Sequence, residues 1–278
     1  MRCGPPAMRR GPMSLVAWSV AVGRRPFAPP TAMVAPRPPL TRPLRFETAF
    51  ALKVPHGLCV GVRLAPAAGQ GAEDGCTWAL PTEVQASKTM LSRERQLSYC
   101  GGRAALRKAM ADCGAPADQP IARDGHGAPV LPEGVLGSIS HTRGLAVALV
   151  RLRRPGEEGT ALGVDVERAA RALRSPVARR VLTAAEAAGL EEEAADDDAR
   201  RRGTLLRFSF KEAVYKAASQ LRVPGLAFRA LEVRPHLDGT AAARWVGATE
   251  ALNAELATDL RWREEGEYFL TFVEMRRV

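Results

Sequence analysis

The segment "LGVDVE", residues 162–167, constrains the fold of this chain more than any other feature. Its short apolar run predicts a buried strand. Because successive side chains of a strand point to opposite faces, its two valines would pack in the core while Asp165 and Glu167 project together from the other face. Two carboxylates on one face repel each other and are costly to desolvate unless a cation or a basic group lies between them.

These two acids allow two interpretations. In one, they are exposed at the end of the strand and pair with the nearby Arg168 and Arg171. In the other, they bind a cation. A bare Asp-x-Glu pattern is common, so the choice depends on which other side chains could join them.

The segment "TLLRFSFKEAVYKAASQL", residues 204–221, predicts the most regular helix of the chain. Phe208, Glu212 and Lys216 recur every four residues and share one side, opposite an apolar side formed by Leu206, Phe210, Val214, Ala217 and Leu221. Alone, Glu212 and Lys216 would be an ordinary surface ion pair, stabilising by about 0.2 to 0.5 kcal/mol. Two carboxylates from a strand and one from a helix, however, suit Mg²⁺ when water and phosphate oxygens complete its octahedral shell. The adjoining lysines would suit a polyphosphate substrate.

A third polar segment is "GSISHTRGLAVALV", residues 137–150. We expect Ser140, His141 and Thr142 to close a turn just before a strand and to present two hydroxyls and an imidazole at its edge. A single histidine at the start of a strand is also compatible with a purely structural role. No Gly-x-Ser-x-Gly elbow precedes it and no Asp/His spacing supports a serine nucleophile, so a hydrolase triad is not predicted.

Further elements follow from periodicity and from turn residues. A helix is expected from the N-cap Ser92 to a stop at Gly114, with Arg95, Tyr99, Arg103 and Arg107 on one side. We expect strands at 57–64, 76–80, 144–152, 161–166, 227–235 and 267–275, and further helical structure around 175–193. The charged run 191–202 is interpreted as a solvated loop or a frayed helix end rather than a docking site.

The order of these elements predicts the fold class. The halves 46–155 and 160–278 each hold helices and short strands without a strand–helix–strand rhythm, so we expect an α+β architecture. Residues 1–45 are rich in Pro and Arg and lack any period that could bury a face, so we expect a disordered extension. Its composition also resembles a transit peptide, and a translation start placed too far upstream would explain it as well.

The net charge of +10 invites a nucleic-acid function, but its distribution argues against one. Residues 1–46 hold eight arginines and no acid, which leaves 32 basic against 30 acidic residues in 47–278. No segment is long and apolar enough to predict a membrane span. The five cysteines are scattered without ligand-like spacing, so we expect free thiols and a cytoplasmic protein.

Taken in order, "GSISHT", "LGVDVE" and "FSFKEAVYKA" resemble the three motifs of the 4'-phosphopantetheinyl transferases, and the enterobactin synthase component D type among them. The preceding "CGGRAALR" and "GHGAPVLPEGV" are similar to that subgroup as well. The resemblance implies two similar-sized α+β lobes related by a pseudo-twofold, with the active site in the cleft between them. The implied reaction moves the phosphopantetheine arm of coenzyme A to a serine of an acyl or peptidyl carrier protein and releases adenosine 3',5'-bisphosphate.

The resemblance also implies roles for individual residues. Asp165, Glu167 and Glu212 would bind Mg²⁺, which holds the pyrophosphate of coenzyme A. Lys216 would contact phosphate. Other contacts to the phosphates of coenzyme A would come from Ser140, His141 and Arg103, which Arg95 and Arg107 could join.

The base that takes the serine proton is left open among three residues. Glu212 could act directly or through metal-bound water, and Lys211 and Glu186 lie near it in the motifs. We expect a monomer without nucleic-acid or membrane partners. The pathway that it serves is left open among siderophore, nonribosomal peptide, polyketide and fatty-acid synthesis. The alternative is a catalytically inactive module of the same fold that binds coenzyme A or a carrier protein.

Overall fold

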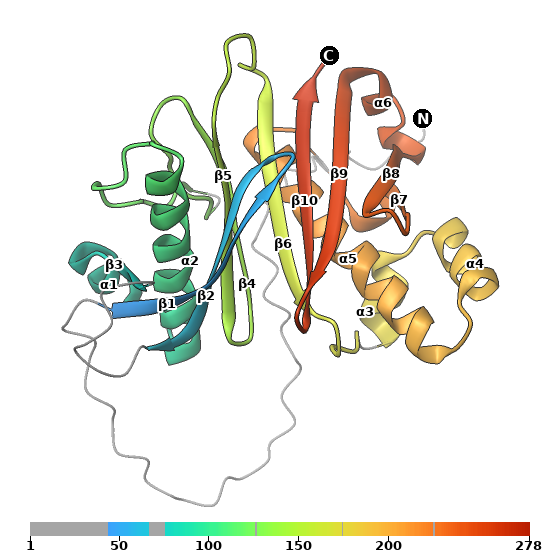
Figure 1. Cartoon of the computed structure of the whole chain (residues 1–278). Helices are drawn as coiled ribbons and strands as arrows, with labels where there is room; N and C mark the ends of the chain where they lie inside the picture. Colours follow the sequence, from blue (N-terminus) through green and yellow to red (C-terminus); the bar gives the residue numbers. More distant parts are fainter. Residues whose placement is uncertain (1–43, 67–75, 126, 174, 225) are drawn as a thin grey trace, which may run out of the picture.

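The computed structural model of the chain describes residues 44–66, 76–125, 127–173, 175–224 and 226–278. They form two lobes, each with a five-stranded antiparallel sheet and helices (Figure 1). This arrangement confirms the α+β class predicted from the order of elements. The expectation for residues 1–45 lies outside the described residues, apart from Leu44 and Arg45, which already belong to the first strand.

The N-terminal sheet has the strand order β3-β1-β2-β5-β4. Its strands are β1 (Leu44–Val54), β2 (Gly57–Pro66), β3 (Cys76–Ala79), β4 (Val135–Thr142) and β5 (Leu145–Leu152). Two helices accompany it, α1 (Pro81–Ser87) and α2 (Arg93–Asp112). Ser92 caps α2 as predicted, since its side chain accepts a hydrogen bond from the backbone N–H of Arg95. The chain then turns through Gly114, which has a φ of 74°.

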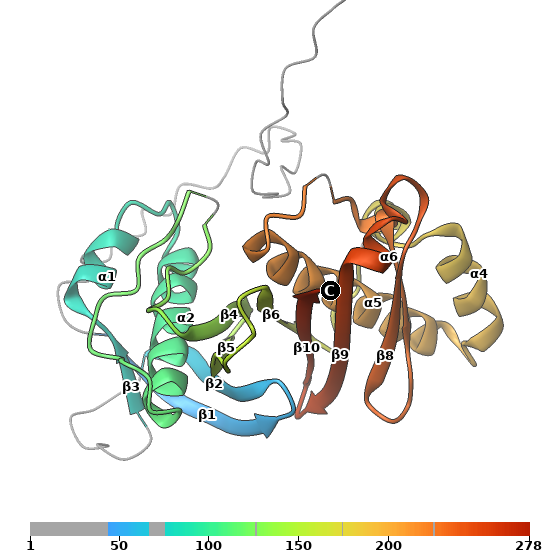
Figure 2. The ribbon, with the colours of Figure 1, turned by 90° about the horizontal axis from the view of Figure 1, so that it is seen from above.

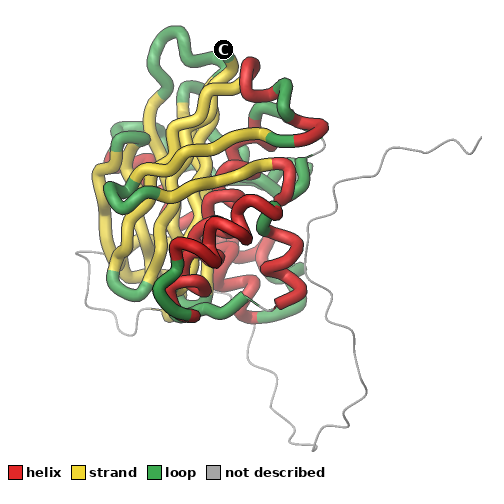
Figure 3. Tube along the Cα trace, turned by 90° about the vertical axis from the view of Figure 1, so that its right-hand side faces the viewer, coloured by secondary structure: helices red, strands yellow, loops and turns green. Residues whose placement is uncertain are grey.

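The C-terminal sheet has the order β6-β10-β9-β8-β7. Its strands are β6 (Thr160–Arg168), β7 (Leu231–Pro235), β8 (Thr240–Trp245), β9 (Leu256–Glu265) and β10 (Tyr268–Arg277). The helices are α3 (Ser175–Val181), α4 (Ala184–Glu193), α5 (Asp197–Gln220) and α6 (Leu252–Glu255), with short 3₁₀ turns at Phe228–Ala230 and Gly247–Thr249. Seen from the side of this lobe, the strands gather on one side of the molecule and most helices on the other (Figure 3).

Three apolar clusters form the core, and one of them joins the two lobes. One lies between α2 and the N-terminal sheet, and a second lies between α5 and the C-terminal sheet. The third joins the sheet faces turned away from these two helices, and it includes Leu145, Val147 and Leu149 of β5 with Leu162, Val164 and Val166 of β6. Viewed from above, the lobes stand side by side, with β4, β5 and β6 between α2 and α5 (Figure 2). The valines of the acidic strand therefore pack in the core between the lobes, as predicted.

Several expectations about local structure are corrected. Ser140 and His141 lie within β4 rather than in a turn, because the two-residue loop Arg143–Gly144 makes the turn and Gly144 supplies a φ of 88°. Helix α5 begins at Asp197, so the second half of the charged run forms its first turns under the cap Asp196. The segment 227–235 is a strand only from Leu231, and the strands β1, β4, β8 and β9 were not predicted.

Two further expectations concern bulk properties. Along the described part of the chain, no helix has the length and apolar character needed to cross a membrane. The four cysteines within the described ranges are free thiols: Cys59, Cys76, Cys100 and Cys113.

Candidate active site

The acidic strand meets helix α5 at a point where the backbones approach unusually closely. A Cβ atom on Gly163 of β6 would lie 1.9 Å from the carbonyl oxygen of Ala213 in α5. Only glycine permits that approach. Because side chains alternate along β6, Asp165 and Glu167 lie on the same face as Gly163 and therefore face α5.

Asp165 is buried, with 4% of its surface exposed, and both its oxygens accept hydrogen bonds. Oδ1 accepts from the hydroxyl of Ser140 at 2.7 Å and from the ammonium of Lys216 at 2.8 Å. Oδ2 accepts from the hydroxyl of Ser209 at 2.8 Å. The exposed pair of acids that the sequence allowed is thus excluded, because the strand buries this carboxylate among donors from β4 and α5.

Lys216 joins the two lobes at this carboxylate. Its ammonium donates to Oδ1 of Asp165, to the hydroxyl of Ser140 at 2.8 Å and to the carbonyl oxygen of Val164 at 2.9 Å. The ion pair that α5 could have made between Glu212 and Lys216 is replaced by the pair between Lys216 and Asp165. Ser140 comes from the N-terminal lobe and the other residues from the C-terminal lobe, so the cluster lies where the lobes meet.

Glu167, the second acid of the strand, is 5% exposed, and only one of its two carboxylate oxygens has a partner. Its Oε1 lies 2.5 Å from Nη1 of Arg171, whereas its buried Oε2 has no hydrogen-bond partner. Burial raises the pKa of Glu167 to about 7, and the charge of Asp165 adds to the shift. A buried, unpaired carboxylate oxygen is rare and is a plausible ligand for a cation.

Glu212 is the third predicted ligand and lies on α5. Burial raises its pKa, and the charge of Asp165 raises it further, while Lys216 and Arg171 oppose the shift. The charge of Asp165 thus raises the pKa of both glutamates. The repulsion between Asp165 and these two acids favours a bound cation.

The fit to a metal ion rests on this donor chemistry. Within the described ranges, no three His, Cys, Asp or Glu side chains stand in an arrangement that could hold a metal as they are. Lys216 and Arg171 supply positive charge to two of the carboxylates. The oxygen-only donor set and the orphaned Oε2 of Glu167 nevertheless match the preference of Mg²⁺ for carboxylate and water ligands.

His141 lies at the end of β4, near Lys216 and Asp165, and part of its surface is open to solvent. The protein atoms around its ring desolvate it enough to lower its pKa, and the charge of Lys216 lowers the pKa further. The imidazole is therefore mainly neutral at pH 7 and can donate a hydrogen bond through one ring nitrogen.

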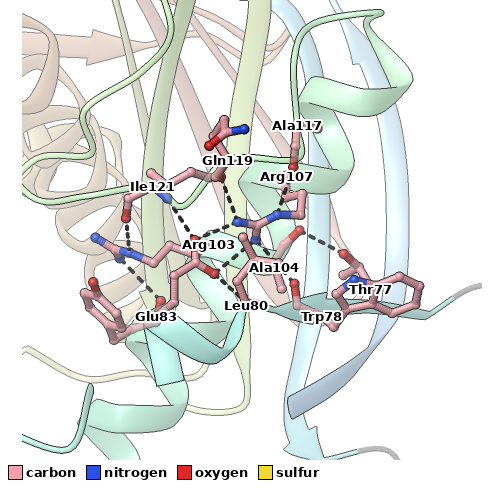
Figure 4. Close-up of polar contacts among 11 residues, drawn as sticks. Thr77, Trp78, Leu80, Glu83, Arg103, Ala104, Arg107, Ala117, Gln119 and Ile121 are labelled. Atoms are coloured by element: carbon pink, nitrogen blue, oxygen red, sulfur yellow. Dashed lines mark hydrogen bonds and ion pairs between the residues drawn. The ribbon is translucent and has the colours of Figure 1, made fainter. Parts of the chain in front are cut away.

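Two arginines of α2 make buried contacts within the N-terminal lobe. The guanidinium of Arg103 is buried, lies 3.5 Å from the centroid of the Tyr99 ring, and donates to the carbonyl oxygen of Ile121 at 2.9 Å. Arg107 forms a two-pronged ion pair with Glu83, with its closest contact at 2.7 Å (Figure 4). It also donates to the carbonyl oxygens of Trp78, Ala117 and Gln119.

These contacts tie α2 to α1 and to the loop that follows α2 (Figure 4). Arg107 therefore has a clear structural role. Arg95 is exposed and lies in the first turn of α2, four residues before Tyr99.

Lys211 and Glu186 are brought together, but not with the carboxylate cluster. The ammonium of Lys211 lies 2.6 Å from Oε2 of Glu186 and 2.8 Å from the carbonyl oxygen of Val181. Glu186 also accepts from the backbone N–H groups of Thr183 and Val233, each at 2.8 Å. Both side chains are buried, and together they fasten α5 to α4 and β7.

Two residues of the cluster were not singled out from the sequence. Ser209 on α5 bonds Asp165, and its oxygen also lies 2.9 Å from the hydroxyl of Thr271 on β10. Ser209 lies three residues before Glu212, so helical spacing could have indicated it. Thr271 could not have been found, because its place opposite Asp165 depends on the register of β6 with β10.

Comparisons with known proteins agree with this arrangement of two lobes. Residues 83–151 match the 4'-phosphopantetheinyl transferase N-terminal domain, and residues 161–273 match the 4'-phosphopantetheinyl transferase superfamily. No curated protein matches the chain.

Solved structures give weaker likenesses. An ACPS-CoA complex from Chronobacterium ammoniagenes is 21% identical with a TM-score of 0.34, covering 44% of this chain and 99% of its own. The holo-ACP-synthase of Plasmodium yoelii is 15% identical with a TM-score of 0.33, covering 42% of this chain and 97% of its own. The acyl carrier protein synthase of Mycobacterium tuberculosis is 21% identical with a TM-score of 0.30, covering 42% and 96%.

Both lobes thus match domains of one family of transferases, and the two matches together cover more than half of the chain. The chain belongs to the 4'-phosphopantetheinyl transferase superfamily. The narrower resemblance to the enterobactin synthase component D type stays a prediction from the sequence motifs.

Proposed function

We propose that this protein transfers the 4'-phosphopantetheine arm of coenzyme A to a serine of an acyl or peptidyl carrier protein. The observation that carries the proposal is the buried cluster of Asp165, Lys216 and Ser140 at the junction of the lobes. Glu167 and Glu212 lie near enough for the charge of Asp165 to raise their pKa. A cluster that combines three acids with a lysine suits a cation together with phosphate oxygens. Membership of the transferase superfamily supports the reaction class.

Asp165, Glu167 and Glu212 would hold Mg²⁺. When bound, the metal neutralises charge on the pyrophosphate of coenzyme A. Lys216 would contribute a second positive charge to the phosphate oxygens, and Ser140 and the neutral ring of His141 would donate hydrogen bonds. Arg103 and Arg95 on α2 are proposed as further contacts to the phosphates.

The chemical step is a phosphoryl transfer. The oxygen of the carrier serine forms a bond to the β-phosphorus of coenzyme A, the bond to the bridging oxygen breaks, and adenosine 3',5'-bisphosphate leaves. The serine proton must pass to a base. Among the three candidates, Glu212 is favoured because it lies beside the cluster, whereas Lys211 and Glu186 are buried against each other and against backbone groups.

The direct test incubates the purified protein with Mg²⁺, coenzyme A and a panel of apo carrier proteins, and follows carrier mass. The expected result is a gain of one phosphopantetheine on at least one carrier, and loss of that gain in Asp165→Asn. An unmodified panel would contradict the transferase function. If calorimetry still detected coenzyme A binding in that case, the alternative of an inactive binding module would be supported instead.

A further inference from the structure

Oδ2 of Asp165 contacts a buried pair of hydroxyl groups from two separate elements. Ser209 of α5 donates to this oxygen at 2.8 Å, and Thr271 of β10 lies 2.9 Å from the oxygen of Ser209. Neither residue is exposed to solvent. Substrate therefore does not reach them, and any influence on chemistry passes through Asp165.

The orientation of the two hydroxyl protons follows from the number of donors available to Asp165 and Ser209. An ionised carboxylate can only accept, so the single proton of the Ser209 hydroxyl points to Oδ2. The bond between the two hydroxyls must then be made with the proton of Thr271. Thr271 thus donates to Ser209, and Ser209 donates to Asp165, which gives each hydroxyl one defined orientation.

We propose that Ser209 and Thr271 are positioning residues that fix the carboxylate of Asp165 for binding a divalent cation. A carboxylate rotates about its terminal torsion over a broad range unless a neighbour restrains it. The bond to Oδ2 sets that torsion and leaves Oδ1 directed to Lys216 and Ser140, where the positive charge of the cluster lies. The register of β10 with β6 sets Thr271 directly opposite Asp165, so the restraint is built into the sheet.

Residues that hydrogen-bond to a metal ligand without touching the metal have measurable effects on metal affinity. Removing a hydrogen bond to a ligating side chain typically weakens metal binding or activity by about 10-fold to 100-fold. This inference rests on the proposed function for the identity of the metal ligand, but its main readout is cation affinity rather than transfer.

The experiment titrates Mn²⁺ into the full-length protein in the presence of coenzyme A and measures bound Mn²⁺ by electron paramagnetic resonance, with coenzyme A alone as background. Mn²⁺ is a suitable probe because it accepts the same oxygen ligands as Mg²⁺. Ser209→Ala removes the donor to Asp165 with little change in volume. Thr271→Val removes the second hydroxyl, and Thr271→Ser retains it.

The matched control is Thr204→Val, which also removes a buried hydroxyl from α5. Thr204 donates to the carbonyl oxygen of Arg200 in its own helix and makes no hydrogen bond to the cluster. Circular dichroism and urea unfolding establish that each variant is folded.

We expect Ser209→Ala to weaken Mn²⁺ binding about 10-fold or more. Thr271→Val should produce a smaller loss in the same direction, while Thr271→Ser and Thr204→Val should keep the affinity of the unaltered protein. Equal Mn²⁺ affinity in all four variants would overturn the positioning role while leaving the transferase proposal intact. If the protein modifies no carrier but its variants show this order of Mn²⁺ affinities, the proposed function is overturned and the positioning role is supported. If the unaltered protein binds no Mn²⁺ at all, the positioning role and the metal part of the proposed function are both overturned.

Discussion

Replacing Lys211 by Met tests whether the buried pair with Glu186 is structural. The lysine has no exposed side-chain surface and the glutamate has 4%, so the pair is not screened by solvent. Removing one partner of a buried ion pair leaves an uncompensated charge and typically lowers the free energy of unfolding by about 3 to 5 kcal/mol.

The expected loss for Lys211→Met lies at the lower end of that range, because Glu186 keeps two backbone donors. The N–H groups of Thr183 and Val233 would still bond its oxygens. A loss of about 3 kcal/mol corresponds to a fall in melting temperature of about 6 to 12 °C for a folded region of this size. Glu186→Gln should likewise destabilise, and the double variant should recover part of the loss because no unpaired charge remains.

The assay is urea unfolding of the four proteins of this double-mutant cycle, with carrier modification measured below the transition. We expect transfer by the folded Lys211→Met protein to stay within a few-fold of the unaltered protein. The reasoning is refuted if Lys211→Met loses less than about 1 kcal/mol of stability and yet abolishes transfer. The pair would then act in the reaction, as the motifs alone allowed.

Three further predictions follow from single contacts. Gly163→Ala should prevent normal folding, since a Cβ would lie 1.9 Å from the Ala213 carbonyl oxygen, and circular dichroism should detect the loss. Asp165→Asn should abolish transfer to a carrier while the far-ultraviolet spectrum stays unchanged; retained transfer would contradict a requirement for negative charge at this position. His56, buried in the turn between β1 and β2 and facing Asp259, Glu274 and Arg261, has its pKa lowered from 6.5, mainly by burial. Its contribution to stability should therefore be present above pH 6.5 and be lost as the pH falls below it, and urea unfolding at pH 7.5 and 5.5 should show a smaller difference in His56→Gln.

The sequence predicted the elements whose patterns are local. Strand β6 was predictable because its apolar run is short and bounded, and α2 because Ser92 and Gly114 mark its ends. The strands β8 and β9 were not, since "TAAARW" is rich in alanine, which is depleted in strands, and "LATDLRWREE" is too polar to indicate burial. They form strands because of their neighbours in the sheet: β9 pairs with β10 in a hairpin, and β8 pairs with β9 and β7.

The candidate site was likewise predictable where residue type and spacing indicate it, and not where packing between distant elements decides. Asp165, Glu167 and Ser140 were indicated by residue type and spacing, and the structure brings Asp165 and Ser140 into direct contact. The environment of Lys211 could not be inferred in this way. Adjacent residues on a helix face different neighbours, and only the packing of α4 and β7 sets Lys211 against Glu186 rather than beside Glu212.

The position of α5 explains how one strand can bury two acids. Gly163 lets the helix approach the strand until Ser209 and Lys216 reach Asp165, while the pair of Lys211 and Glu186 fastens another side of the helix to α4 and β7. A shift of α5 along its axis by one residue, about 1.5 Å, would break hydrogen bonds of about 2.8 Å on both sides at once. The repulsion between the acids is thus opposed by contacts that also fix the register of the helix, so the charged site and the stability of the C-terminal lobe depend on the same few residues.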